Sequence, residues 1–119
     1  MNDRTKMILY EVEHAPTFSQ NIRQLRTYVQ KQVGMLDGNP IPESLQKQFN
    51  LLAKANSVLL RLFQALCSVP DPNVRALLMA RAEIGLPWEL MKPPGGGDAK
   101  AAVIAWLDEH GHELVFKEG

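Results

Sequence analysis

The chain has 119 residues, with 13 basic side chains, 13 acidic side chains and one cysteine. A domain of this length buries roughly two-thirds of the surface that its unfolded chain exposes. Its 45% apolar and 22% charged residues are typical of a folded globular protein. The net charge is zero, so the excess positive field of most nucleic-acid binders is missing. The single cysteine, Cys67, excludes an intramolecular disulfide and a thiolate zinc cage.

Residues 1–16 predict an extended arm or a short strand. The segment from Met7 to Val12 is apolar and partly β-branched, which is typical of a strand. Its uncharged part, Met7 to Tyr10, is too short for the core of a signal peptide or for a membrane span. We therefore expect a cytoplasmic protein.

Residues 17–33 predict the first helix. Thr17 and Gln20 have the spacing of a capping box, and Gly34 is a natural helix end. Apolar residues follow at helical spacing, and they are Phe18, Ile22, Leu25, Val29 and Val33. Residues 37–42 have the composition of a turn, across which this helix and the next can pack antiparallel.

Residues 43–68 predict a long central helix, in which four leucines stand seven residues apart: Leu45, Leu52, Leu59 and Leu66. The apolar side chains of this helix cover an arc of roughly 220°, from Val58 and Leu51 at one edge to Leu60 and Ala53 at the other. A helix on one small core needs an apolar stripe of only about 100°. We therefore expect this helix to be buried on two sides, by its own domain or by a second chain.

Two residues of the central helix, Cys67 and Asn56, are polar or reactive although they fall within or beside the apolar arc. Cys67 falls on the apolar arc, so we expect a buried and inert thiol. Asn56 interrupts the arc. It either fixes the register of a seam through a buried hydrogen bond or lies at the rim of the apolar surface.

The remaining sequence predicts two further helices. The third spans residues 72–84, with Asp71 as its N-cap and Pro72 at its first position. Residues 93–98 form a proline- and glycine-rich hinge, and the last helix spans residues 98–110 with Asp98 as its N-cap. The sequence thus predicts one mainly α domain over residues 1–119. It has four helices, of which the long helix at residues 43–68 is central, and short extended N- and C-terminal segments.

The segment from Leu86 to Met91 is short, apolar and flanked by prolines. It presents Trp88 without a long apolar face of its own. A large aromatic in such a position is either a core residue or an anchor for a partner protein, and the sequence leaves both interpretations open.

The sequence offers little catalytic chemistry, and we expect no enzyme and no cofactor. His110, His112 and Glu113 could chelate a metal, but Phe116 stands where a zinc protease needs its second histidine. The glycines at 95–97 precede a helix but lack the Gly-Lys-Ser/Thr ending of a phosphate loop. A small metal-dependent enzyme around the two histidines is therefore the least favoured of three functions considered, after the two described next.

A second alternative is a DNA-associated accessory protein. It would use the basic side chains Arg23, Arg26, Lys31, Arg75 and Arg81. The simpler interpretation of such charges is a solvated face. A basic zipper is excluded, because glycines and prolines between residues 34 and 42 separate any basic helix from the leucine seam.

In length, helical organisation and the seam from Leu45 to Leu66, the chain resembles the small helical quorum-sensing anti-activators of bacteria, which bind LuxR-type receptors. The resemblance implies a non-catalytic protein-binding regulator that sequesters a transcription factor, and the wide apolar arc predicts a homodimer. Phage-encoded inhibitors and other small adaptors fit the same outline. The contact residues that we expect are Leu45, Leu52, Leu59, Leu62, Phe63, Leu66, Leu86, Trp88 and Met91.

Overall fold

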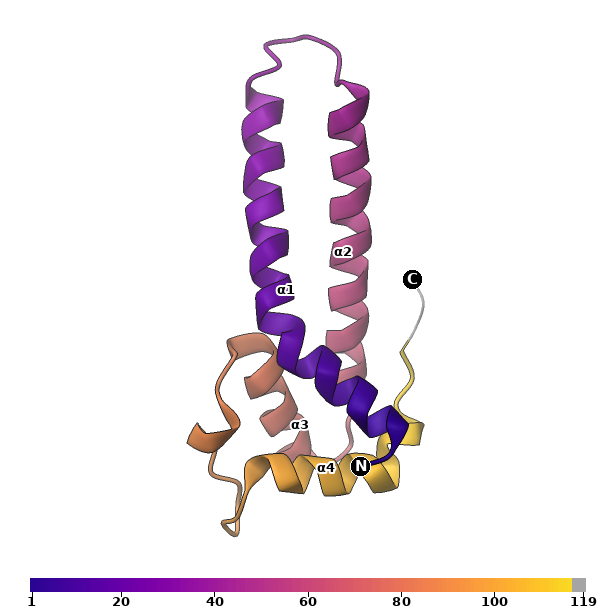
Figure 1. Cartoon of the computed structure of the whole chain (residues 1–119), viewed down its shortest axis with the longest axis vertical. Coiled ribbons are helices and arrows are strands. Elements are labelled where there is room, and N and C mark those ends of the chain that lie inside the picture. Colours follow the sequence, from indigo (N-terminus) through magenta and orange to yellow (C-terminus); the bar gives the residue numbers. More distant parts are fainter. Residues whose placement is uncertain (117–119) are drawn as a thin grey trace.

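The computed structural model describes residues 1–116, and every regular element within them is helical (Figure 1). The four predicted helices and the mainly α fold are confirmed. The α-helices are α1 (Asp3–Gly34), α2 (Glu43–Cys67), α3 (Pro72–Met79) and α4 (Ala99–His110). Three short elements complete the fold: the π-helical turn η1 (Ala80–Ile84) and the 3-10 helices η2 (Trp88–Leu90) and η3 (Gly111–Glu113).

Helices α1 and α2 run antiparallel and form a long hairpin across residues 35–42, as predicted (Figure 1). We call residues 17–60 the stalk, and the other described residues, 1–16 and 61–116, the base. The molecule measures 59 × 28 × 20 Å and has a radius of gyration of 17.8 Å. A compact chain of this length would have a radius of gyration of about 13.5 Å. The stalk therefore extends well beyond the base.

The predicted arm or strand at residues 1–16 is wrong, because these residues form the first turns of α1. Asn2 caps the helix by accepting a hydrogen bond from the backbone N–H of Thr5 at 2.8 Å, so Thr17 lies inside α1 and is not a cap. Pro16 removes one backbone hydrogen bond within α1, and the helix is bent between base and stalk (Figure 1). The apolar run is one helix face, with buried residues at three- and four-residue spacing: Thr5, Ile8, Leu9, Val12 and Ala15.

The buried core cluster lies entirely in the base. It joins the first half of α1, the end of α2, α3, η1, η2, α4 and the C-terminal segment, and its fully buried side chains include Ile8, Val12, Leu66, Val69, Leu78, Val103 and Leu107. Arg4 donates hydrogen bonds to the backbone carbonyls of Gly111 and Leu114. The two ends of the described chain are thereby held together. The predicted C-terminal extended piece is helical as far as Glu113 and becomes extended only at Leu114.

The predicted starts of α3 and α4 are confirmed by their caps. Asp71 accepts hydrogen bonds from the backbone N–H groups of Asn73 and Val74. Asp98 accepts one from the backbone N–H of Ala101. These side chains satisfy amide groups that the first turn of a helix leaves without a partner.

Candidate protein-interaction surface

The leucine seam of α2 is used inside the chain, where it faces α1. Leu45, Leu62 and Leu66 are buried, and three further residues of the predicted surface are half-buried, namely Leu52, Leu59 and Phe63. A side chain that packs within its own chain offers little area to a partner. The buried leucines are therefore occupied by packing within the chain, whereas a contact role for the half-buried residues stays a prediction. The most exposed apolar side chains of α2 lie at the edges of the arc.

The Leu86–Met91 segment also belongs to the core rather than to an exposed surface. Trp88 is 8% exposed and Met91 is buried, and both join the core cluster, while Leu86 packs against it. Of the four large apolar side chains in the segment, which are Leu86, Trp88, Leu90 and Met91, only Leu90 is exposed. The open choice for Trp88 is thus decided in favour of the core, because η2 folds the indole against the base.

Two pairs of apolar side chains remain exposed on α2, at opposite edges of its arc. At 100° per residue, Leu51 and Val58 lie on one side of the seam, whereas Phe49 and Leu60 lie on the other. Leu51 and Leu60 are each 57% exposed. We call the two sides of the hairpin the Leu51 flank and the Leu60 flank. The width of the arc was the signal that could have identified these residues from the sequence, because α1 covers only its middle.

Cys67 corrects a further expectation, since it is exposed rather than buried. It is the last residue of α2 and lies seven residues after Leu60. The two side chains share one stripe of the helix. The Leu60 edge of the arc is therefore uncovered along the second half of α2.

The stalk has little buried surface of its own. Its buried side chains are Ile22, Val29 and Leu45, and none of them belongs to the core cluster of the base. Two-helix hairpins without further packing are weakly stable, because helices in water depend on the burial of an apolar face. The stalk thus has apolar surface in excess of what α1 and α2 bury together.

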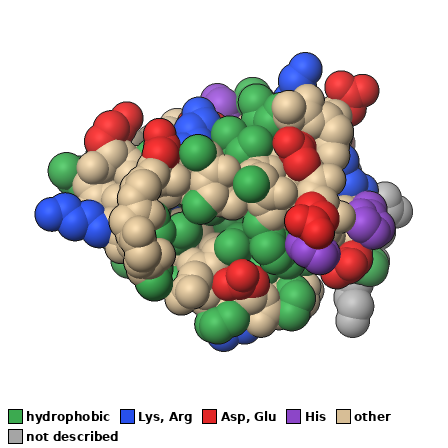
Figure 2. All heavy atoms as spheres, turned by 90° about the horizontal axis from the view of Figure 1, so that it is seen from below, with side chains coloured by type: hydrophobic (Ala, Val, Ile, Leu, Met, Phe, Trp, Pro, Cys, Tyr) green, Lys and Arg blue, Asp and Glu red, His purple; other side chains and the backbone are tan. Residues whose placement is uncertain are grey.

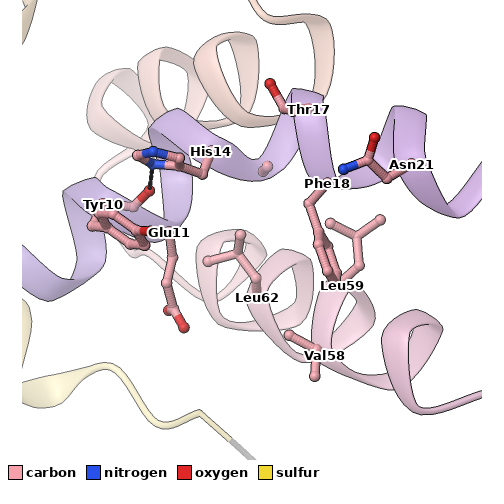
Figure 3. A pocket seen from close by; sticks show the side chains of 10 residues that line it. Tyr10, Glu11, His14, Thr17, Phe18, Asn21, Val58, Leu59 and Leu62 are labelled. Carbon is pink, nitrogen blue, oxygen red and sulfur yellow. Dashed lines mark hydrogen bonds between the residues drawn. The ribbon is translucent and has the colours of Figure 1, made fainter. Parts of the chain in front are cut away.

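A hollow of about 340 Å³ opens on the Leu51 flank, where the stalk meets the base (Figure 3). At its rim, the ring of Tyr10 stacks on His14 with 4.0 Å between centroids, and His14 Nδ1 donates a hydrogen bond to the Tyr10 carbonyl at 2.8 Å. The hollow suits an apolar side chain. Its sides come from α1 and α2 and include Phe18, Val58, Leu59 and Leu62.

The Leu60 flank has a polar bridge across the same two helices. Arg26 Nη2 donates a hydrogen bond to Asn56 Oδ1 at 3.2 Å. Asn56 is half-buried at the rim of the seam. Its amide therefore has a partner in its own chain, and α1 and α2 are joined on this side by a charged donor.

Charge is divided unequally between stalk and base. Residues 17–60 contain five basic and two acidic side chains, a formal +3, so the rest of the neutral chain carries −3. One of the two stalk acids, Glu43, lies 3.8 Å from Lys47. Figure 2, seen from the base end, shows Asp and Glu side chains spread over that end. The basic stalk residues are Arg23, Arg26, Lys31, Lys47 and Lys54.

The two alternative sites receive little support from the geometry. His110 Nδ1 lies 3.4 Å from Glu113 Oε1, but residues 1–116 contain no group of three His, Cys, Asp or Glu side chains that could hold a metal ion. Arg75 is half-buried and donates to the Val69 carbonyl at 3.0 Å. Arg75 and Arg81 belong to the base, so the basic residues expected to contact DNA are split between base and stalk.

Within the part of the chain that the structure describes, we find no helix with the length and apolar character needed to cross a bilayer. Comparison with known proteins found no matching protein family, no curated relative and no matching solved structure.

Proposed function

We propose that this chain is a non-catalytic protein-binding regulator that acts as a homodimer and sequesters a transcription factor. The observation that carries the proposal is the stalk. It extends beyond the base (Figure 1), and it exposes apolar side chains on both flanks. A surface of this kind is typical of protein–protein interaction sites.

The exposed apolar side chains of the stalk would stabilise a complex if a partner buried them. Full burial of a leucine side chain contributes about 1.5–3 kcal/mol relative to exposure. Leu51 and Leu60 are each 57% exposed, so a large part of that contribution is not realised within one chain. A partner that covers either flank would bury these side chains, and this burial would stabilise both the complex and the packing of the two stalk helices.

The two flanks differ, which favours a different partner for each. The Leu51 flank has an apolar hollow next to Val58. The Leu60 flank carries the Arg26 guanidinium and the exposed Cys67. We assign the Leu51 flank to a second copy of the chain and the Leu60 flank to the target protein, for which an acidic rim is the best complement.

The target class, a transcription factor of the LuxR type, comes from the resemblance to quorum-sensing anti-activators. Wild-type protein and the Leu60→Glu variant are immobilised, and the proteins that each captures from host extract are identified. The captured regulator is then purified, and its DNA binding is measured by gel shift with either variant added. We expect wild type to release the DNA and Leu60→Glu to lose at least tenfold in potency, since one interface anchor contributes about 2 kcal/mol. Equal potency, or capture without any effect on DNA binding, would sink the proposal.

The DNA-associated alternative is favoured by one observation, the net positive stalk with exposed Arg23 and Lys31. Contacts to several phosphates would make the affinity for duplex DNA fall steeply with salt. A titration of labelled duplex between 50 and 200 mM salt, roughly the range over which phosphate contacts cost several orders of magnitude, separates the two functions. Strong, salt-sensitive DNA binding by the chain alone supports the alternative, whereas its absence supports the protein-binding function.

A further inference from the structure

We infer that the second copy packs along the Leu51 flank in an antiparallel orientation, so that each stalk tip lies beside the base of the other copy. The inference rests on the proposed self-association. It adds the face, the orientation and the register of the dimer. The area of the flank is sufficient for such a face, charge supports the orientation, and the position of the hollow supports the register.

The Leu51 flank is large enough for a stable dimer. Helix α2 has 25 residues, which gives a length of about 37 Å at 1.5 Å per residue, and two neighbouring helices are about 20 Å wide. One flank of the hairpin then offers about 700 Å² per copy, close to the roughly 800 Å² that each partner contributes to a standard interface. Leu51, Val58 and the hollow all lie along this strip.

Charge favours the antiparallel orientation. A parallel dimer would place two stalks of formal charge +3 side by side and two bases of −3 together. In the antiparallel dimer, the stalk tip with Lys31 and Lys47 approaches the base of the other copy. Glu11, which borders the hollow, lies 4.0 Å from Arg61 of its own chain, and Glu13 lies 3.6 Å from Lys100. The attraction therefore comes from the net −3 of the base and the net +3 of the stalk, which meet at both ends of the interface.

The hollow suggests the register. In a two-fold interface, residue i contacts residue j and residue j contacts residue i. If the exposed Ile41 at the tip packs against the hollow of the other copy, formed between Val58 and Leu62, the two-fold axis passes halfway between Ile41 and the hollow. That midpoint falls at about Leu51, which is more exposed than Val58. Leu51 then packs against its own counterpart.

The hollow, rather than charge, favours the Leu51 flank over the Leu60 flank for a second copy. The Leu60 flank carries Arg26, and Arg23 stands one turn away on the same helix. At 100° per residue, Lys47 and Lys54 stand on the Leu51 side of α2, so a two-fold axis brings like charges together on either flank. The hollow next to Val58 gives the Leu51 flank an apolar site for the tip of the other copy.

Disulfide trapping tests the face and the register. In a Cys67→Ser background, Leu51→Cys should give a covalent dimer on mild oxidation, because the axis brings the two Cα atoms within the roughly 4.4–6.8 Å that a disulfide spans. Leu60→Cys in the same background is the matched control, since Leu60 has the same 57% exposure on the opposite flank. It should stay a single chain on denaturing gels.

Three outcomes overturn the inference, and they can be told apart from failure of the proposed function. Covalent dimers from Leu60→Cys but not Leu51→Cys would move the interface to the other flank while self-association stands. Equal yields of covalent dimer from both variants would show that neither flank is specifically at the interface. A wild-type protein that remains a single chain at high micromolar concentration would remove the dimer altogether, although target capture by that single chain would still support a binding regulator.

Discussion

The Cβ of Pro16 lies 3.3 Å from the position that a Cβ atom on Gly85 would occupy. Gly85 has a φ of +77° and ends η1. The bent part of α1 thus packs directly on the backbone that follows α3. This close approach lies at the point where the stalk leaves the base, within a helix of 32 residues.

A side chain at Gly85 should disturb that junction. We expect Gly85→Ala to lower the free energy of unfolding by about 1–2 kcal/mol, because an L-residue is strained at positive φ and the new Cβ presses on Pro16. Gly34→Ala is the matched control, since Gly34 has no neighbour within 4 Å of an added Cβ and should be neutral or slightly stabilising. Urea unfolding of both variants checks the prediction, and equal midpoints would refute it.

Trp88 should behave as a core residue. Trp88→Ala should cost about 3–5 kcal/mol of folding stability, as large-to-small substitutions in cores do. Leu90→Ala, two residues away and 66% exposed, should change stability by no more than about 0.5 kcal/mol. Thermal melting compares the two. An unchanged melting curve for Trp88→Ala together with lost target capture would return Trp88 to the role of an interface anchor.

The hydrogen bond between Arg26 and Asn56 should stabilise the stalk within one chain, and it should not fix the register of the dimer. A double-mutant cycle with Arg26→Ala and Asn56→Leu should give a coupling of about 0.5–1 kcal/mol, as expected for an exposed hydrogen bond with a charged donor. Asn56→Leu should leave the oligomeric state unchanged, because it lies toward the Leu60 flank. A change of mass in sedimentation would restore the register role.

Asp108 should make the attachment of the N-terminus sensitive to acid. The Thr5 hydroxyl beside it, the Asn2 backbone N–H at 3.0 Å and the N-terminal ammonium at 3.7 Å hold the pKa of Asp108 below its ordinary value of 3.8. A lowered folded pKa contributes stability that is present above pH 3.8 and is lost as pH falls through the folded value. Stability of the wild type should therefore fall more steeply below about pH 4 than that of Asp108→Asn, whose residue 108 does not titrate. Parallel curves for the two proteins would contradict this.

Most helix boundaries could be predicted because their signals are local. Asp71, Pro72 and Asp98 start helices through contacts within one turn, and Gly85, in the left-handed region, ends η1. The N-terminal half of α1 could not be predicted, because Pro16 and the β-branched residues of the run around Ile8 imitate a strand. These residues form a helix because α4 and the C-terminal end of α2 pack against their apolar face. Both contacts join distant parts of the sequence.

The candidate surface could be predicted only in outline. The 220° arc correctly indicates that α2 carries more apolar surface than one neighbour can cover. Which part α1 covers depends on how the two helices are rotated against each other, and this rotation is set by packing in the base. The sequence alone therefore does not show that Leu59 is half-buried beside the hollow, whereas Leu51 and Leu60 at the edges are exposed.

The central claim, a stalk that pairs two copies through the Leu51 flank, is tested most directly by sedimentation of wild type, Leu51→Glu and Leu60→Glu at micromolar concentration. We predict that wild type and Leu60→Glu sediment with twice the 13.3 kDa mass of one chain. Leu51→Glu should sediment as a single folded chain, because it places two carboxylates at the axis. A well-folded wild-type protein of 13.3 kDa, or a Leu51→Glu variant that remains a dimer, would contradict the claim.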